Sequence, residues 1–164
     1  MKEIYTRASI RKFQDRPVEE EKITALLRAA MAAPSAGNQQ PWEFYVVRNP
    51  EMIRALSGVS PYSGCAARAN VVIVSVYREK LWAPAYAHVD MSIAMENLWL
   101  ACEEQGLGGV WLGIAPEEER MQAVENILAL PEGVRAFAVF PLGYPAEARE
   151  RPDRFDPERI HYVD

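Results

Sequence analysis

Cysteine and long apolar runs are scarce in this chain, and each shortage excludes a class of protein. Cys65 and Cys102 are the only cysteines among 164 residues, too few for a disulfide framework and compatible with a reducing compartment. No apolar run approaches the ~20 residues that a membrane-spanning helix needs. The first residues also lack the apolar segment of a signal peptide. We therefore expect a cytoplasmic protein with no membrane partner.

Basic charge and histidine are equally limited. The net charge of −5 argues against a general nucleic-acid binder, which would usually carry a basic face. The only histidines, His88 and His161, lie far apart, and no group of Cys, His and Asp has the spacing of metal ligands. We therefore predict neither a metal site nor a side chain that acts as catalytic acid or base. The length and ordinary composition suit one soluble domain, residues 1–164.

Apolar periodicity predicts four helices. Residues Ile23, Leu26 and Ala30, with Leu27 and Met31, repeat at helical spacing and end before Pro34. A stripe from Met91 to Cys102 predicts the longest helix, with Gly106 as its C-terminal cap. Pro116 is expected as the first residue of a helix whose buried side chains are Met121, Val124 and Leu128. The predicted ranges are 19–33, 52–56, 86–105 and 116–130.

Strands are predicted where β-branched and aromatic residues gather between turn residues. Val71 to Val76 is an almost unbroken apolar run, which is typical of a central strand buried on both faces. Three further strands are expected at 42–47, 110–114 and 134–142. Helices and strands are therefore predicted side by side in one chain of mixed α and β structure.

The last twenty residues differ from the rest. Prolines and charges dominate residues 145–164, and few apolar side chains could anchor them. Such a segment cannot build a core of its own. We expect it either to fray or to lie over another surface.

Two blocks near the N-terminus suggest a bound ligand. Arg7, Ser9 and Arg11 alternate, so an extended segment would direct all three toward one side, where two guanidiniums and a hydroxyl suit a phosphate monoester. The block could also be a solvated basic stretch before a turn. Residues 34–42, Pro-Ser-Ala-Gly-Asn-Gln-Gln-Pro-Trp, offer small and polar groups to a flat ring and its sugar alcohol. An ordinary helix-to-strand connection would favour similar residues.

These blocks resemble the nitroreductase family, whose pattern is Arg-x-Ser-x-Arg/Lys-x-Phe, a helix, and Ala-Pro-Ser-x-x-Asn-x-Gln-Pro-Trp. Residues 90–113 are similar to the family's central helix, its Gly-Leu-Gly turn and the strand beside the flavin. Residues 137–144 resemble its closing strand. The likeness covers nearly the whole chain in the right order.

The resemblance implies an α+β, nitroreductase-like fold with helices around a small mixed, mainly antiparallel sheet. It also implies an FMN-binding protein that is an intertwined homodimer, with the tail 145–164 wrapped around the partner subunit. The implied cofactor-binding residues fall into four groups. Arg7, Ala8, Ser9 and Arg11 would hold the phosphate and the ring edge. The second group is Pro34, Ser35, Ala36, Asn38 and Gln40, of which Ser35, Ala36 and Asn38 would come from the other subunit. Trp111, Leu112 and Gly113 would meet the ring or the phosphate. Arg154, with Arg151 as the alternative, would complete the phosphate site.

The implied activity is an FMN-dependent NAD(P)H oxidoreductase that passes hydride through flavin N5 to a nitroaromatic, a quinone or a similar small-molecule acceptor, by a ping-pong mechanism. Only about nine residues, Tyr77 to Ala85, stand where many members carry a lid insertion. This short segment predicts an open pocket. A specialised flavoenzyme of the same family (a dehalogenase or a flavin-fragmenting enzyme) and a non-catalytic flavin-storage protein remain the alternatives.

Overall fold

The computed structural model describes residues 2–149 and 153–163. A central antiparallel sheet has the strand order β1-β2-β5-β3, and β4 also pairs with β5. Its strands are β1 (Trp42–Val47), β2 (Val71–Arg78), β3 (Gly108–Gly109), β4 (Leu112–Gly113) and β5 (Val134–Gly143). Within residues 2–149 and 153–163 all strand pairs are antiparallel, and the one parallel pairing is an isolated bridge between Ser9 and Gly109. The predicted α+β class and mainly antiparallel sheet are thus confirmed.

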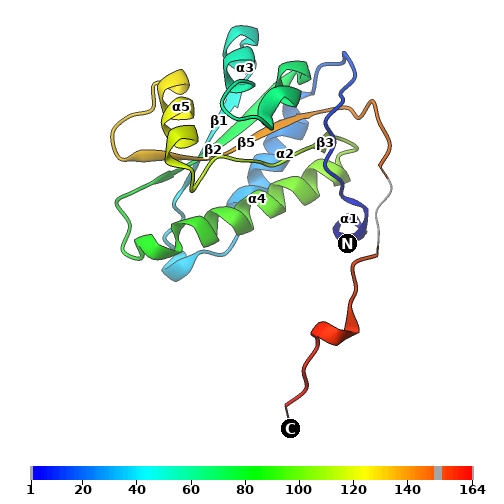
Figure 1. The fold of residues 1–164 in the computed structure, drawn as a ribbon, viewed down its shortest axis with the longest axis vertical. Helices are drawn as coiled ribbons and strands as arrows, with labels where there is room; N and C mark the ends of the chain where they lie inside the picture. Colours follow the sequence, from blue (N-terminus) through cyan, green and yellow to red (C-terminus); the bar gives the residue numbers. More distant parts are fainter. Residues whose placement is uncertain (1, 150–152, 164) are drawn as a thin grey trace.

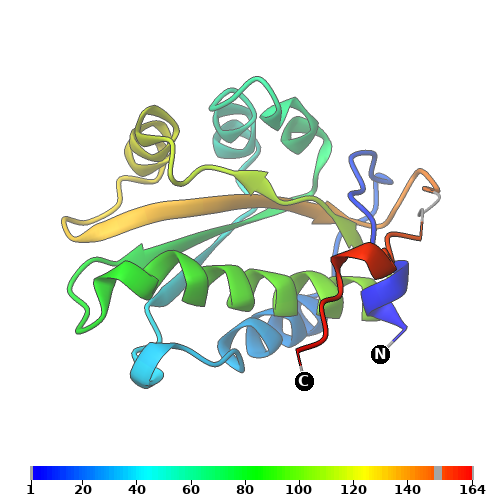
Figure 2. The same ribbon diagram turned by 60° about the horizontal axis from the view of Figure 1, so that its bottom comes forward.

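Helices cover both faces of this sheet (Figures 1 and 2). On one face lie α2 (Glu20–Met31) and α4 (Ala87–Glu104). The other face carries α3 (Pro50–Leu56), α5 (Glu118–Leu128) and the short 3-10 helix η2 (Ser63–Arg68). The remaining elements are the N-terminal α1 (Glu3–Thr6) and the 3-10 turns η1 (Ala36–Asn38), η3 (Pro84–Tyr86) and η4 (Pro157–Arg159).

Strand β2 divides the core into two layers, as its sequence predicts. Val71 and Ile73 belong to the cluster under α2 and α4, whereas Val72, Val74 and Val76 pack toward α3 and α5. Successive side chains of a strand point to opposite faces, so an unbroken apolar run is what two covered faces require. All five side chains are at most 1% exposed.

The longest helix, α4, follows its predicted stripe. Met91, Met95 and Leu98 are fully buried, together with Ala94 and Cys102. The helix ends at Glu104, and Gly106 adopts φ +70° beyond it. The N–H of Leu107 then donates to the Cys102 carbonyl at 3.0 Å, which is the bond that a left-handed glycine cap provides. The predicted cap is confirmed.

Two sequence predictions are wrong in this region. Of the expected strand 110–114 only Leu112 and Gly113 form a strand, β4. The two-residue β3 precedes the expected range at Gly108–Gly109, in the same register against β5. Pro141 stands opposite the interruption and has no N–H to donate to the ladder. Helix α5 begins at Glu118 and not at Pro116. The chain is still bonded to the sheet at Ala115, whose N–H donates to the Phe137 carbonyl at 2.9 Å.

The tail divides into two parts. Its first residues stay on their own chain, where the Ala146 N–H donates to the Lys12 carbonyl at 2.9 Å and Glu147 Oε1 accepts from the Arg11 N–H at 2.7 Å. Residues 153–163 extend away from the globular body, drawn red in Figure 1. Their apolar side chains are exposed and include Phe155, Tyr162 and Val163, of which Val163 is 95% exposed. Wrapping around a partner therefore concerns at most the later part of the tail.

Candidate functional site

The segment that carries Arg7, Ala8, Ser9 and Arg11 lies against β3. Ser9 bridges to Gly109, and the Ile10 N–H donates to the Gly109 carbonyl at 2.9 Å. A Cβ added at Gly108 would stand 2.6 Å from a side-chain carbon of Ile10. Glycine at this position therefore allows the N-terminal segment to approach the sheet, and the buried Ile10 anchors it there.

The Arg7 side chain packs against α4. Its guanidinium carbon lies 3.9 Å from the centre of the Trp99 ring, and its Nε is 3.5 Å from Glu96 Oε1. The Nη1 atom is buried and has no hydrogen-bond partner in the structure. A buried guanidinium nitrogen without an acceptor is costly, and an anionic ligand oxygen would satisfy it. This is the contact that a phosphate group would supply.

Arg11 leaves the segment in a different direction. It lines a cavity of about 330 Å³ together with Trp111, Leu112 and Gly113. Four of the predicted site residues thus meet around one hollow. This volume falls at the lower end of the ~300–1,000 Å³ of small-molecule pockets. Trp111 also packs against Phe137 in a T-shaped arrangement, with ring centres 5.6 Å apart.

Ser60, Tyr62 and Arg120 complete this wall and were missed by sequence reasoning. The loop of Ser60 and Tyr62 matches no diagnostic pattern, and Arg120 follows three glutamates near the predicted start of a helix, a context that does not point to a ligand. Contacts between distant parts of the chain bring them here. A separate cavity of about 370 Å³, between the end of α5 and the start of β5, contains none of the predicted site residues.

The loop of Pro34, Ser35, Ala36, Asn38 and Gln40 has an unusual backbone. Gly37, Asn38 and Gln40 all have positive φ, at +50°, +57° and +45°. Non-glycine residues seldom adopt this region, and strained loops of this kind cluster at functional sites. The Gln40 N–H donates to Ser35 Oγ at 3.0 Å, and Gln40 Nε2 donates to Asn38 Oδ1 at 2.8 Å. Pro34 is exposed beside them.

Asp90 holds this loop and was also missed. It is only 2% exposed, and its carboxylate accepts from the Ala36 N–H at 2.9 Å and from Gln39 Nε2 at 2.7 Å. Gln39 in turn exchanges two hydrogen bonds with the Ala83 backbone. No sequence signal separates Asp90 from an ordinary acidic residue in the first turn of a helix.

Within one chain the two predicted blocks do not meet. The 34–40 loop is bonded to Asp90 in the first turn of α4, whereas Arg7 packs on Trp99 nine residues further along. At a rise of 1.5 Å per residue this separation is about 13 Å along the helix. Arg154 lies in the extended segment 153–163 and is exposed, and Arg151 lies outside the described residues.

The other reactive groups have structural partners. Burial raises the pKa of the Cys102 thiol, and burial also raises the pKa of Cys65, against the opposing effect of Arg11. Neither thiol is therefore activated as a nucleophile. His88 Nε2 lies 3.1 Å from the Tyr77 hydroxyl. Among the described residues no cluster of three His, Cys, Asp or Glu could hold a metal ion, and no described helix is long and apolar enough to span a membrane.

Comparison with known proteins agrees with this architecture. The nitroreductase family profile matches residues 4–67 and 59–144. A protein of Archaeoglobus fulgidus with the provisional name NADH dehydrogenase/NAD(P)H nitroreductase is 43% identical and covers 98% of this chain and 95% of its own length. A relative from Methanothermobacter thermautotrophicus with the same name is 46% identical, over 96% and 83%.

Solved structures show the same fold. A protein of Clostridium acetobutylicum, provisionally named an NADH oxidase, superimposes with a TM-score of 0.95 at 42% identity and 99% coverage of both chains. A Desulfovibrio desulfuricans nitroreductase homologue, crystallised with FMN, has a TM-score of 0.86 at 27% identity, over 99% of this chain and 95% of its own. The chain therefore belongs to the nitroreductase family, a family of FMN-dependent oxidoreductases.

Proposed function

We propose that this chain is an FMN-dependent NAD(P)H oxidoreductase that reduces a nitroaromatic, a quinone or a similar small acceptor. The observation that carries the proposal is the buried Arg7 Nη1, which has no hydrogen-bond partner among the described residues and lies on the same segment as Ser9. A phosphate oxygen matches this donor in charge and geometry. FMN carries such a phosphate, whereas riboflavin does not.

The residues present fit this cofactor. Arg7 and Ser9 would hold the phosphate, and Arg11 would face the ring edge from the cavity wall. The Trp111–Gly113 segment would support the ring, and the exposed Gly113, with nothing within 4 Å of a Cβ placed there, leaves room for close approach. When bound, FMN supplies hydride acceptance and donation at N5. The protein would bind and orient the reactants, which is consistent with the lack of an activated side chain.

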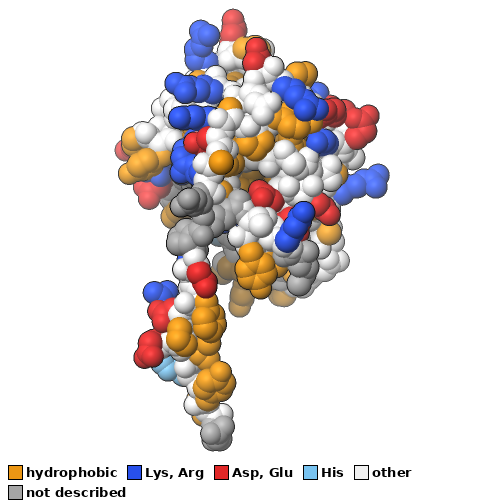
Figure 3. Space-filling view, turned by 90° about the vertical axis from the view of Figure 1, so that its right-hand side faces the viewer, with side chains coloured by type: hydrophobic (Ala, Val, Ile, Leu, Met, Phe, Trp, Pro, Cys, Tyr) orange, Lys and Arg blue, Asp and Glu red, His pale blue; other side chains and the backbone are white. Residues whose placement is uncertain are grey.

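Each chain is proposed to be a single domain, and two such chains are proposed to form a homodimer that shares each flavin site. The 34–40 loop and Arg7 contact α4 about 13 Å apart in one chain, so a second copy is the simplest source of the missing half. Exposed apolar residues support a partner: Met31, Val89 and Ile4 are each 53% exposed on α2, α4 and α1. The tail 153–163 presents further apolar side chains, visible in Figure 3. Arg154, or Arg151 as the alternative, remains the proposed late phosphate ligand.

Flavin release tests the cofactor. The purified protein should be yellow and should release FMN, not FAD or riboflavin, on denaturation. Arg7→Ala should weaken FMN binding by roughly 10–100-fold, because a hydrogen bond to a charged group is worth ~1.5–3 kcal/mol. Arg28→Ala, an exposed α2 arginine that lines none of the cavities described above, is the matched control. An Arg7→Ala protein that keeps FMN affinity within threefold would show that the phosphate lies elsewhere.

Anaerobic reduction separates an enzyme from a storage protein. NADH or NADPH added without oxygen should bleach the flavin absorbance, and a nitroaromatic or quinone should then restore it. A flavin-storage protein would stay yellow. Bleaching that only a halogenated substrate reverses would instead favour a dehalogenase, the activity that a 26% identical relative from Thermotoga neapolitana, an iodotyrosine deiodinase, carries in its name.

A further inference from the structure

Arg120 brings a second guanidinium to the cavity beside Trp111, Leu112 and Gly113. It comes from α5, is partly buried, and donates from Nη1 to the Gly113 carbonyl at 3.4 Å. Arg11 enters the same cavity from the N-terminal segment. The two cations therefore reach one cavity from distant parts of the sequence, and within the described residues no carboxylate contributes to its lining.

Two of the nearby acidic groups, Glu118 and Glu147, have partners outside this cavity. Glu118 Oε1 lies 2.6 Å from Arg135, and Glu147 Oε1 accepts from the backbone N–H groups of Arg11 and Lys12. The three glutamates at 117–119 line a separate cavity of about 640 Å³, where Arg120 forms part of the boundary. No ion pair of Arg11 or Arg120 is found in the parts of the chain that the structure describes. Because neither guanidinium is held in a direct ion pair, both can interact with a ligand in the cavity of about 330 Å³.

We propose that Arg120 is an electrostatic residue of the flavin site that makes the bound cofactor easier to reduce. This inference rests on the proposed FMN function. A hydride brings two electrons to the ring, so reduced flavin carries one more negative charge than oxidised flavin until a proton neutralises it. The nicotinamide that loses the hydride becomes a cation and departs. A guanidinium stays protonated and, in a partly enclosed cavity, interacts with that charge more strongly than in bulk water.

The prediction is a selective loss of affinity for reduced FMN. Arg120→Gln should lower the ratio of reduced to oxidised FMN affinity by about 3–30-fold, the range expected for one charge at cavity distance. A tenfold change corresponds to a midpoint potential lower by about 30 mV for a two-electron couple. Arg120→Lys should stay within threefold of the wild type because it keeps the charge. Arg54→Gln, an exposed arginine of α3 outside the cavity, should change nothing.

The measurements are anaerobic titrations of the FMN-loaded protein against a reference dye, together with dissociation constants for both oxidation states. Arg120→Met replaces the glutamine variant if circular dichroism shows that the latter is unfolded. If the ratio of reduced to oxidised FMN affinity in Arg120→Gln stays within twofold of the wild type, the proposal is overturned, whether or not the KM for an acceptor rises. Equal losses for both oxidation states would also overturn it, since they indicate plain binding. Failure of the proposed function itself would be seen earlier, as a wild-type protein that binds no FMN.

Discussion

At Gly37 a single added carbon would collide with an aromatic ring. A Cβ there would stand 2.0 Å from the Trp82 ring, and the backbone already has φ +50°. Gly37→Ala should therefore destabilise the protein by about 1 kcal/mol or more and displace Trp82. The free energy of unfolding measures the first effect and tryptophan fluorescence the second.

Gly64→Ala is the matched control for this change, because nothing lies within 4 Å of its Cβ and its φ is not positive. A Trp82→Ala background separates strain from collision. In that background Gly37→Ala should cost less, since only the backbone strain remains. Equal costs in both backgrounds would show that Trp82 does not rest on Gly37.

Glu19 gives the protein a pH-dependent contact. The Tyr144 hydroxyl donates to Glu19 Oε2 at 2.7 Å, and this bond, the largest cause, lowers the pKa of Glu19 from 4.5 to about 2. A carboxyl with a lowered pKa stabilises the fold above its unfolded pKa, and the benefit is lost as pH falls through the folded value. Tyr144→Phe should therefore reduce stability at pH 7, and its difference from the wild type should shrink between pH 4.5 and 2.

Acid unfolding curves of the two proteins, with the Glu19 pKa read by NMR, check this expectation. In Tyr144→Phe the pKa should move back toward 4.5. Tyr162→Phe, which alters an exposed tail tyrosine, should leave it unchanged. A pKa that remains near 2 without the Tyr144 hydroxyl would assign the shift to Arg16 and the backbone of Glu19 instead.

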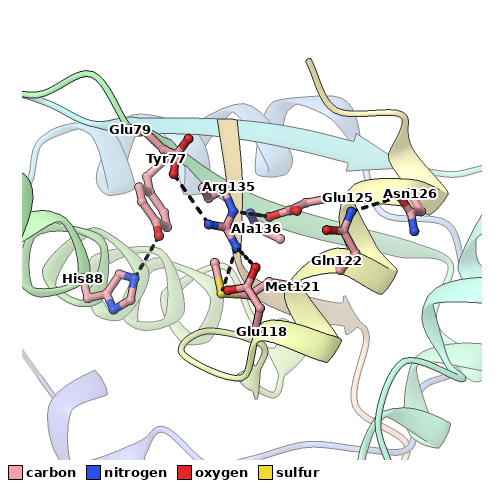
Figure 4. A network of polar contacts seen from close by, with 10 residues as sticks. All are labelled: Tyr77, Glu79, His88, Glu118, Met121, Gln122, Glu125, Asn126, Arg135 and Ala136. Carbon is pink, nitrogen blue, oxygen red and sulfur yellow. Dashed lines mark hydrogen bonds and ion pairs between the residues drawn. The ribbon is translucent and has the colours of Figure 1, made fainter. Parts of the chain in front are cut away.

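Among the elements, α5 is fastened to the sheet by one arginine (Figure 4). Arg135 of β5 reaches Glu118 at 2.6 Å, Glu125 at 2.8 Å and, more loosely, Glu79 beyond β2 at 3.5 Å. Glu125 Oε1 also accepts the Ala136 N–H at 3.0 Å. The Glu125 side chain is only 12% exposed. Removal of the Arg135 guanidinium would therefore leave the Glu125 carboxylate poorly hydrated and without its charge partner.

Arg135→Met should therefore cost about 1–3 kcal/mol of unfolding free energy. Arg48→Met is the control, since its ion pair with Glu20 is largely solvent-exposed and should be worth at most about 1 kcal/mol. Chemical denaturation of both variants gives the comparison. Equal small losses would mean that the Arg135 network contributes no more than a surface pair.

At the scale of the whole molecule, removal of the tail should abolish dimerisation and FMN binding together. Truncation after Tyr144 removes the exposed apolar side chains of 153–163, among them Phe155, Ile160 and Tyr162. We expect loss of dimerisation and of bound FMN in parallel, because two subunits are proposed to complete each site. Light scattering with flavin absorbance measures both. A truncated monomer with stoichiometric FMN would contradict the shared site.

A milder truncation controls for damage to the chain's own contacts. Ala146 and Glu147 are bonded to the segment 11–12, so a protein that ends after Arg149 keeps these bonds and loses only the later tail. If the later tail binds the partner, this variant should dimerise as weakly as the shorter one. If the protein that ends after Arg149 dimerises normally and the protein that ends after Tyr144 does not, the contacts needed for dimerisation lie in residues 145–149.

Local pattern determined the secondary elements because burial repeats along the chain with the period of the element. The α4 stripe from Met91 to Cys102 and the two-faced β2 run are both found as predicted. The boundaries of β3, β4 and α5 needed tertiary information. Pro141 interrupts a strand thirty residues before it in sequence, and the Phe137 carbonyl keeps Ala115 in the sheet.

The sequence by itself determined the fold class, the family and the residues that form motifs, since motif spacing records local backbone requirements. Only the tertiary structure decided which of them share a place. It places Arg11 and the Trp111–Gly113 segment around one cavity, together with Arg120. It also brings the 34–40 loop to Asp90, whose carboxylate accepts a hydrogen bond from the backbone of that loop. Such contacts join residues tens of positions apart. Packing and hydrogen bonding select them, and no local period in the chain reveals them.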